Sequence, residues 1–107
     1  TGRAIGRING WPKLVPEDAG GHPDPAILEA SRYVDAVNFA PRCKAEAIMS
    51  IGFIDRTCPP TGNFAAYNTL PGKKRLITKP LMGHSAPPEI HAEFREAILE
   101  HARGKKE

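Results

Sequence analysis

The fold class is decided by one short stretch, AIMSIGFID, at residues 47–55. Residues 47–54 are almost continuously apolar, and only Ser50 interrupts them with a polar side chain. A run of this length that is rich in isoleucine is typical of a strand buried on both faces, as in parallel sheets. The run ends at a carboxylate, Asp55, and we therefore predict a buried strand that delivers an acid to its C-terminal end.

Helical patterns lie on both sides of this strand. Asp24-Pro25 supplies an N-cap and a first-turn proline, and an apolar surface then continues to Ala40, where Pro41 stops regular helix. Further along the chain we expect a helix ending at Leu70 and capped by Thr57 or Thr61, a second strand at about 75–81, and a last helix from Pro87-Pro88 to Gly104.

Strands that alternate with helices predict an α/β fold, with a parallel sheet and helices on its faces. We divide the chain into an extended segment rich in glycine and proline at residues 1–23 and an α/β segment at residues 24–107. Two strands do not make a stable sheet alone, so we expect neighbouring strands from a part of the protein that this chain does not contain.

Composition excludes several classes of function. The chain has 107 residues, 40% of them hydrophobic, and a net charge of +3; its basic residues are interspersed with acidic ones along the chain. No apolar run is long enough to span a membrane, and the densest basic stretch, residues 73–75, is expected to be a solvated turn rather than a nucleic-acid contact. Cys43 and Cys58 flank the predicted strand too far apart for a disulfide, and they do not indicate a compartment.

Two residues at strand ends are the candidates for chemistry. Asp55 follows the first predicted strand, and His84 follows the second, 29 positions later. The carboxyl ends of parallel strands meet at one edge of a sheet, where α/β proteins bind ligands. An acid and then a histidine in this order matches the second and third members of a Ser-Asp-His triad. The alternative is a capping aspartate and a histidine bonded to backbone.

The sequence offers no nucleophile in a suitable setting. No Gly-x-Ser-x-Gly motif is present; Ser31 is predicted in a helix, Ser50 in mid-strand, and Ser85 beside His84. Cys58 as a nucleophile is a weaker alternative to a packing role. The other histidines, His22, His91 and His101, are scattered, so we expect neither a metal site nor a cofactor.

A longer stretch and a second motif carry a family resemblance. The run YVDAVNFAPRCKAEAIMSIGFIDRTCPPTGNFAAYNTL, followed by GHSAPP, resembles the C-terminal region of acetyl xylan esterases and cephalosporin C deacetylases, which form carbohydrate esterase family seven. The resemblance covers about residues 30–100 and places the family's catalytic aspartate at Asp55 and its histidine at His84. This chain differs in having Ser85 where the family usually has an acid, and Cys58 where threonine is common.

The resemblance implies the C-terminal portion of an α/β-hydrolase that deacetylates xylo-oligosaccharides or related small acetyl esters. It implies that the serine comes from an N-terminal part of the same hydrolase, that no metal takes part, and that the enzyme forms homo-oligomers. This chain alone is expected to be inactive. A non-catalytic docking module with relic motifs, or a fragment of a peptidase or dienelactone-type hydrolase, would be the alternatives.

Overall fold

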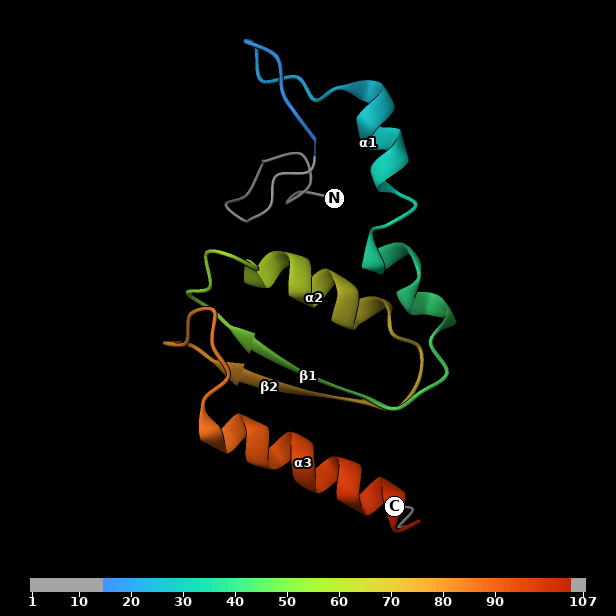
Figure 1. Ribbon diagram of the computed structural model, residues 1–107, viewed down its shortest axis with the longest axis vertical. Coiled ribbons are helices and arrows are strands. Elements are labelled where there is room, and N and C mark those ends of the chain that lie inside the picture. The colour runs from blue at the N-terminus through green and yellow to red at the C-terminus, as the bar shows by residue number, and fades with distance from the viewer. Residues whose placement is uncertain (1–14, 105–107) are drawn as a thin grey trace.

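A computed structural model describes residues 15–104 of the chain. A two-stranded parallel sheet lies between helix α2, Pro60–Thr69, and helix α3, Pro88–Ala102 (Figure 1). Helix α1, Pro25–Ser31, lies beyond α2 on the side away from the sheet (Figure 1). The predicted order of helix, strand, helix, strand and helix is therefore confirmed.

Strand β1 is Ala47–Gly52 and strand β2 is Lys74–Lys79. They pair in parallel with Ala47 opposite Lys74 and Gly52 opposite Lys79, so both strands end at the same edge. Ile51 is fully buried, whereas residues 47–50 are half-buried. The strand predicted to be covered on both faces is thus buried only at its C-terminal end within the described residues, because the sheet has only two strands there.

Both strands end two residues earlier than their patterns predict. Phe53 and Ile54 form a turn after β1, and Pro80 and Leu81 form one after β2. The Ile54 N–H donates to the Met82 carbonyl at 3.2 Å, so it bonds the following loop rather than a strand. The two turns therefore hold each other at the strand ends, and the apolar composition of residues 53–54 gave no sign of this.

The first helix is much shorter than predicted. Asp24 caps α1 by accepting from the Ile27 N–H at 3.0 Å, as expected, but the helix ends at Ser31. Asp35 then caps a separate 3₁₀ turn, Ala36–Asn38, and a second turn, Ala40–Arg42, follows it. The apolar surface up to residue 40 is therefore carried by turns, because a side-chain cap at Asp35 competes with continued helix.

The predicted threonine cap of α2 is wrong. Helix α2 begins at Pro60 without a side-chain cap: Pro59 stands at the N-cap position, so Thr57 lies before the cap and Thr61 lies inside the helix. The C-terminal end of α2 is held by Lys74, whose ammonium donates to the carbonyls of Tyr67 and Leu70 at 2.9 and 3.0 Å. Lys74 and Arg75 therefore belong to β2, and the expectation of a solvated turn fails for them.

Helix α3 matches its prediction closely. It has a proline in its first turn together with Glu89, and His101 in its last turn, where charges of these signs favour the helix dipole. Its buried residue is Ile90. Arg75 of β2 pairs with Glu93 of α3 at 3.6 Å, so the helix is tied to the sheet at its surface.

Residues 15–23 precede α1 as an irregular segment. A bridge pairs Glu17 with Pro23, a turn lies between them, and Gly21 adopts a φ of 75°, which suits glycine. Val15 is buried against Leu28 of α1. The remainder of the segment predicted at residues 1–23, residues 1–14, lies outside the described part of the chain. None of the described helices has the length and apolar character needed to cross a membrane.

Candidate active site

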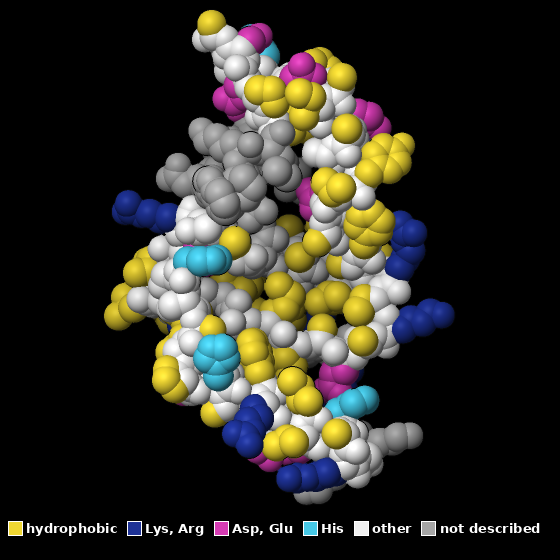
Figure 2. All heavy atoms as spheres, in the orientation of Figure 1, with side chains coloured by type: hydrophobic (Ala, Val, Ile, Leu, Met, Phe, Trp, Pro, Cys, Tyr) yellow, Lys and Arg dark blue, Asp and Glu magenta, His cyan; other side chains and the backbone are white. Residues whose placement is uncertain are grey.

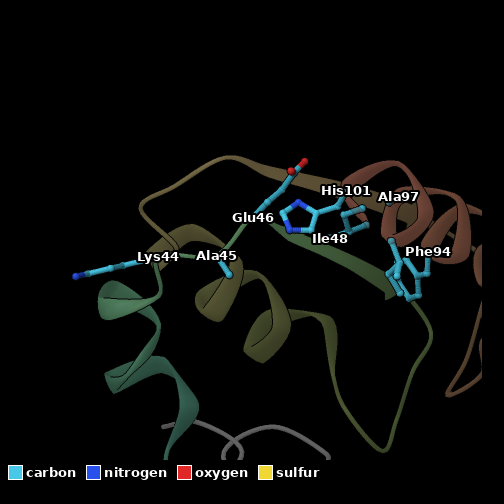
Figure 3. Close-up of a pocket in the computed structure, with 8 residues that line it drawn as sticks. Lys44, Ala45, Glu46, Ile48, Phe94, Ala97 and His101 are labelled. Carbon is cyan, nitrogen blue, oxygen red and sulfur yellow. The ribbon is translucent and has the colours of Figure 1, made fainter. Parts of the chain in front are cut away.

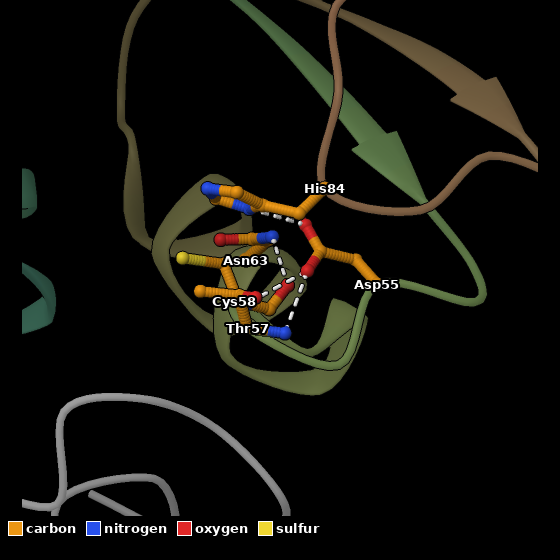
Figure 4. A network of polar contacts seen from close by, with 5 residues as sticks. All are labelled: Asp55, Thr57, Cys58, Asn63 and His84. Atoms are coloured by element: carbon orange, nitrogen blue, oxygen red, sulfur yellow. Dashed lines mark hydrogen bonds and ion pairs between the residues drawn. The ribbon is translucent and has the colours of Figure 1, made fainter.

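The structure brings Asp55 and His84 together at the C-terminal edge of the sheet. Asp55 lies three residues beyond β1 and His84 five residues beyond β2. Imidazole Nδ1 of His84 lies 3.0 Å from Oδ2 of Asp55 (Figure 4). The predicted meeting of these two side chains across neighbouring strand ends is therefore present in the structure.

Asp55 is oriented by its own loop. Its Oδ1 accepts hydrogen bonds from the N–H groups of Thr57 at 2.9 Å and Cys58 at 2.8 Å (Figure 4). This is an Asx-type turn, in which a short carboxylate bonds the backbone just ahead of it. One oxygen is thereby committed to the loop, and the other is directed at His84.

Asn63 holds the same loop from α2. Its amide Nδ2 donates to the Cys58 carbonyl at 3.0 Å, so the helix holds the peptide unit that follows the one bonded to Asp55 (Figure 4). Asn63 was not predicted from the sequence as part of the site. Its only signal was a polar side chain in the first turn of a helix that follows two prolines, which is too common a pattern to single it out.

The surroundings of Asp55 keep it ionised. Its side chain is only 8% exposed, and burial raises the pKa of the carboxyl. The hydrogen bonds from Cys58, His84 and Thr57 and the attraction of His84 outweigh this, and they leave the pKa of Asp55 below the ordinary value of an aspartate. An ionised carboxylate only accepts, so the proton of the 3.0 Å bond lies on Nδ1 of His84.

The opposite nitrogen of His84, Nε2, is consequently the one with a lone pair in the neutral ring. The His84 side chain is 58% exposed, so the ring is open to another group on its solvent side. The loop that carries it is short and bonded: the Met82 N–H donates to Lys79 at 3.2 Å and the Ser85 N–H to Gly83 at 3.0 Å. The pair can therefore accept a proton at one defined atom.

None of the three serines occupies a strand-to-helix elbow. Ser31 ends α1, where its hydroxyl donates to the Leu28 carbonyl at 2.7 Å, and Ser50 lies inside β1. Ser85 is exposed and directly follows His84. Neither Cys43 nor Cys58 is in a disulfide, as predicted. The Cys58 N–H donates to Asp55 and the Cys58 carbonyl accepts from Asn63, so the backbone of this residue helps to hold the loop.

The other histidines lie away from this pair. His91 and His101 are exposed on α3, and His22 is paired with Asp18 at 3.2 Å in the segment before α1. The sequence reading treated His22 only as a loop residue and missed its partner four positions earlier. Within residues 15–104, no three His, Cys, Asp or Glu side chains are grouped as a metal site would need.

A pocket of about 690 Å³ lies at the other end of the sheet. It is lined by the start of β1 with the residues before it, and by the C-terminal half of α3 (Figure 3). Ile48, Phe94 and Ile98 make it apolar, and Glu46 and His101 lie at its margin. The sequence gave no indication of this pocket, which is formed by residues about 50 positions apart and does not include Asp55 or His84.

Parallel strands flanked by helices, with polar residues at their carboxyl ends, define part of an α/β-hydrolase. Two solved structures share this fold: acetyl xylan esterase 1 from Thermoanaerobacterium sp. JW/SL YS485, at 32% identity and a TM-score of 0.68, and an acetyl xylan esterase from Paenibacillus sp. R4, at 37% and 0.64. Each match covers 70% of this chain, but only 24% and 23% of those chains.

The sequence model of acetyl xylan esterase (AXE1) matches residues 17–102, so this chain belongs to the acetyl xylan esterase family. The acetyl esterase Axe7A of Xylanibacter ruminicola is 29% identical over 75 residues, which are 62% of this chain and 17% of that protein. The resemblance stated from the sequence is confirmed at the level of family and fold. The chain spans less than a quarter of the length of these relatives.

Proposed function

We propose that this chain supplies the acid and the base of a serine carboxylester hydrolase that removes acetyl groups from xylo-oligosaccharides or related small acetyl esters. The carrying observation is the 3.0 Å bond between Nδ1 of His84 and the ionised Asp55. Such a bond fixes the imidazole tautomer in which Nε2 accepts a proton. Support for acetyl esters comes from the relatives, which are named acetyl xylan esterases and an acetyl esterase.

The nucleophile is proposed to be a serine in a part of the hydrolase outside this chain. Its oxygen attacks the acetyl carbonyl carbon while Nε2 of His84 takes its proton. The tetrahedral intermediate then expels the sugar oxygen, which receives that proton, and leaves an acetylated serine. Water repeats the exchange and releases acetate. Asp55 holds the ring and stabilises the imidazolium in both steps.

The same outside part is proposed to complete the sheet, and the whole enzyme to form homo-oligomers. The described residues leave large apolar side chains exposed, among them Tyr33 at 77% and Leu81 at 89%. Hydrophobic side chains occupy much of the face seen in Figure 2. Contiguous apolar surface is commonly covered by further protein. Light scattering on the intact hydrolase measures the assembly, and a monomer at every concentration would contradict the oligomer.

The test replaces His84 in an intact hydrolase that contains this chain together with its serine-bearing part. His84→Ala is expected to lower kcat on p-nitrophenyl acetate and acetylated xylo-oligosaccharide by at least 10³-fold, because the serine loses its base. Labelling by a fluorophosphonate is expected to slow in parallel. His91→Ala, an exposed histidine on α3, is the matched control and is expected to retain activity.

Two outcomes would contradict this function. Absence of turnover and of serine labelling in the unaltered hydrolase would favour a docking module that keeps relic motifs. Cleavage of peptides without cleavage of acetyl esters would favour a peptidase that shares the fold.

A further inference from the structure

The last residue of β1, Gly52, touches the loop that carries His84. Gly52 is buried, and a Cβ built on it would overlap the Met82 carbonyl oxygen and come within 2.7 Å of the Gly83 carbonyl oxygen. Both opposing atoms belong to the backbone rather than to flexible side chains. The residues that carry these two oxygens, Met82 and Gly83, come immediately before His84 in the chain. Only glycine therefore lets this loop lie directly against the strand end.

Hydrogen bonds keep the loop in that place. The Met82 carbonyl that covers Gly52 also accepts from the Ile54 N–H at 3.2 Å, and the Met82 N–H donates to the Lys79 carbonyl at 3.2 Å. A side chain at position 52 would have to push this carbonyl away from both strand ends. Ordinary contact begins at roughly 3.4 Å, so the Gly83 carbonyl would move by more than half an ångström.

We propose that Gly52 is a positioning residue for His84. Because Gly52 has no side chain, the loop at residues 82–84 lies directly against the end of β1, and this placement sets the 3.0 Å distance between Nδ1 of His84 and Oδ2 of Asp55. The Asp55 carboxylate is held by the N–H groups of Thr57 and Cys58, so a shift of the loop at residues 82–84 changes the distance between this carboxylate and His84. A displacement near 1 Å in a catalytic group costs on the order of 10²-fold in rate. This role rests on the proposed function of His84 as the base.

The test is a double-mutant cycle in the intact hydrolase, with Gly52→Ala, His84→Ala and the two together. Gly52→Ala is expected to lower kcat on p-nitrophenyl acetate by about 10²-fold with KM nearly unchanged. In the His84→Ala background the same change is expected to lower kcat no further. A purely structural effect would reduce kcat equally in both backgrounds.

Gly62→Ala is the matched control, since a Cβ at Gly62 meets no described atom within 4 Å. This glycine lies in α2, where alanine favours helix, so activity and thermal stability are expected to be retained. Unaltered kcat in Gly52→Ala, or the same fold loss with and without His84, would overturn the positioning role. Failure of the proposed function is separate, because His84→Ala would then have no effect.

A second variant covers the case in which Gly52→Ala does not fold. One glycine inserted between Leu81 and Met82 changes the position of His84 while leaving Gly52 itself unaltered. A folded protein, checked by circular dichroism and thermal unfolding, is expected with kcat lowered about 10²-fold. Full activity of this folded insertion variant would show that the contact between the loop and the end of β1 does not set the position of His84.

Discussion

Two aspartate–histidine pairs lie in the described part of the chain, and their contacts are nearly the same. In the segment before α1, Asp18 accepts from the N–H groups of Gly20 and His22, both at 2.9 Å, and lies 3.2 Å from Nδ1 of His22. At the sheet edge, Asp55 accepts from two N–H groups of its own loop and lies 3.0 Å from Nδ1 of His84. The contacts differ in one respect: Oδ1 of Asp18 takes all three, whereas Asp55 uses Oδ1 for its loop and Oδ2 for His84.

Their settings differ completely. Asp18 and His22 are four residues apart, and their side chains are 63% and 80% exposed. Asp55 and His84 are 29 residues apart, and Asp55 is 8% exposed. The first pair forms within one turn, whereas the second exists only because two parallel strands end together. The comparison teaches that an acid and an imidazole in contact become a candidate site through burial and placement at the edge of a sheet.

The largest expected difference between the pairs is in turnover. Asp55→Asn in the intact hydrolase is expected to lower kcat on an acetyl ester by about 10⁴-fold, because an amide disfavours the productive imidazole tautomer. Asp18→Asn removes a carboxylate that also contacts two backbone N–H groups and one imidazole, and it is expected to leave kcat unchanged. Steady-state kinetics on both variants measures this, and equal losses would mean that contact alone confers the role.

A smaller effect is expected from the support of the Asp55 loop. Asn63→Ala removes the bond to the Cys58 carbonyl and is expected to lower kcat up to about 10-fold, since one hydrogen bond contributes about 0.5–1.5 kcal/mol. The matched control is Asn38→Ala, because Nδ2 of Asn38 donates to the Arg32 carbonyl at 2.9 Å in the 3₁₀ turn Ala36–Asn38, before β1. If Asn38→Ala lowered kcat by the same factor, the loss in Asn63→Ala would not be due to the support of the Asp55 loop.

The smallest expected effect is on stability in acid. The pKa of Asp55 is lowered in the folded protein: burial raises it, and hydrogen bonds from Cys58, His84 and Thr57 prevail. The unfolded chain therefore binds more protons, so this stabilisation is complete above about pH 4 and is lost as pH falls through the folded pKa. Urea unfolding of the intact hydrolase at several values below about pH 5 is expected to show a flatter pH dependence for Asp55→Asn.

Asp18 sharpens this comparison. The pKa of Asp18 is also lowered: the N–H of His22 lowers it most, burial opposes this, and the Gly20 N–H and the His22 ring lower it further. Its carboxylate is exposed, so water and salt screen these interactions. Asp18→Asn is expected to change the acid dependence of unfolding less than Asp55→Asn, and the reverse order would contradict the difference in burial.

Much of the fold was readable from local patterns. The apolar run at 47–54 predicted β1, Asp24-Pro25 predicted the start of α1, and the double proline at 87–88 predicted the start of α3. The order of elements was enough to predict that Asp55 and His84 meet, because parallel strands end at a common edge. These predictions succeeded since each depends on neighbouring residues or on topology alone.

Other features depended on contacts between distant residues. The end of β1 was misplaced because the Met82 carbonyl, nearly 30 residues further on, bonds Ile54. Lys74 was expected in a solvated turn, yet its ammonium holds the end of α2. No local sequence pattern shows which distant residue will form a hydrogen bond with a given backbone group.

The sequence by itself determined the family, the parallel α/β order and the presence of an acid and a histidine at successive strand ends. The tertiary structure alone decided the distance between those two groups, the burial that separates Asp55 from Asp18, and the contact of Gly52 with the loop before His84. The reason is physical: periodicity and capping act over a few residues, whereas hydrogen-bond lengths and desolvation are set by packing between segments far apart in the chain.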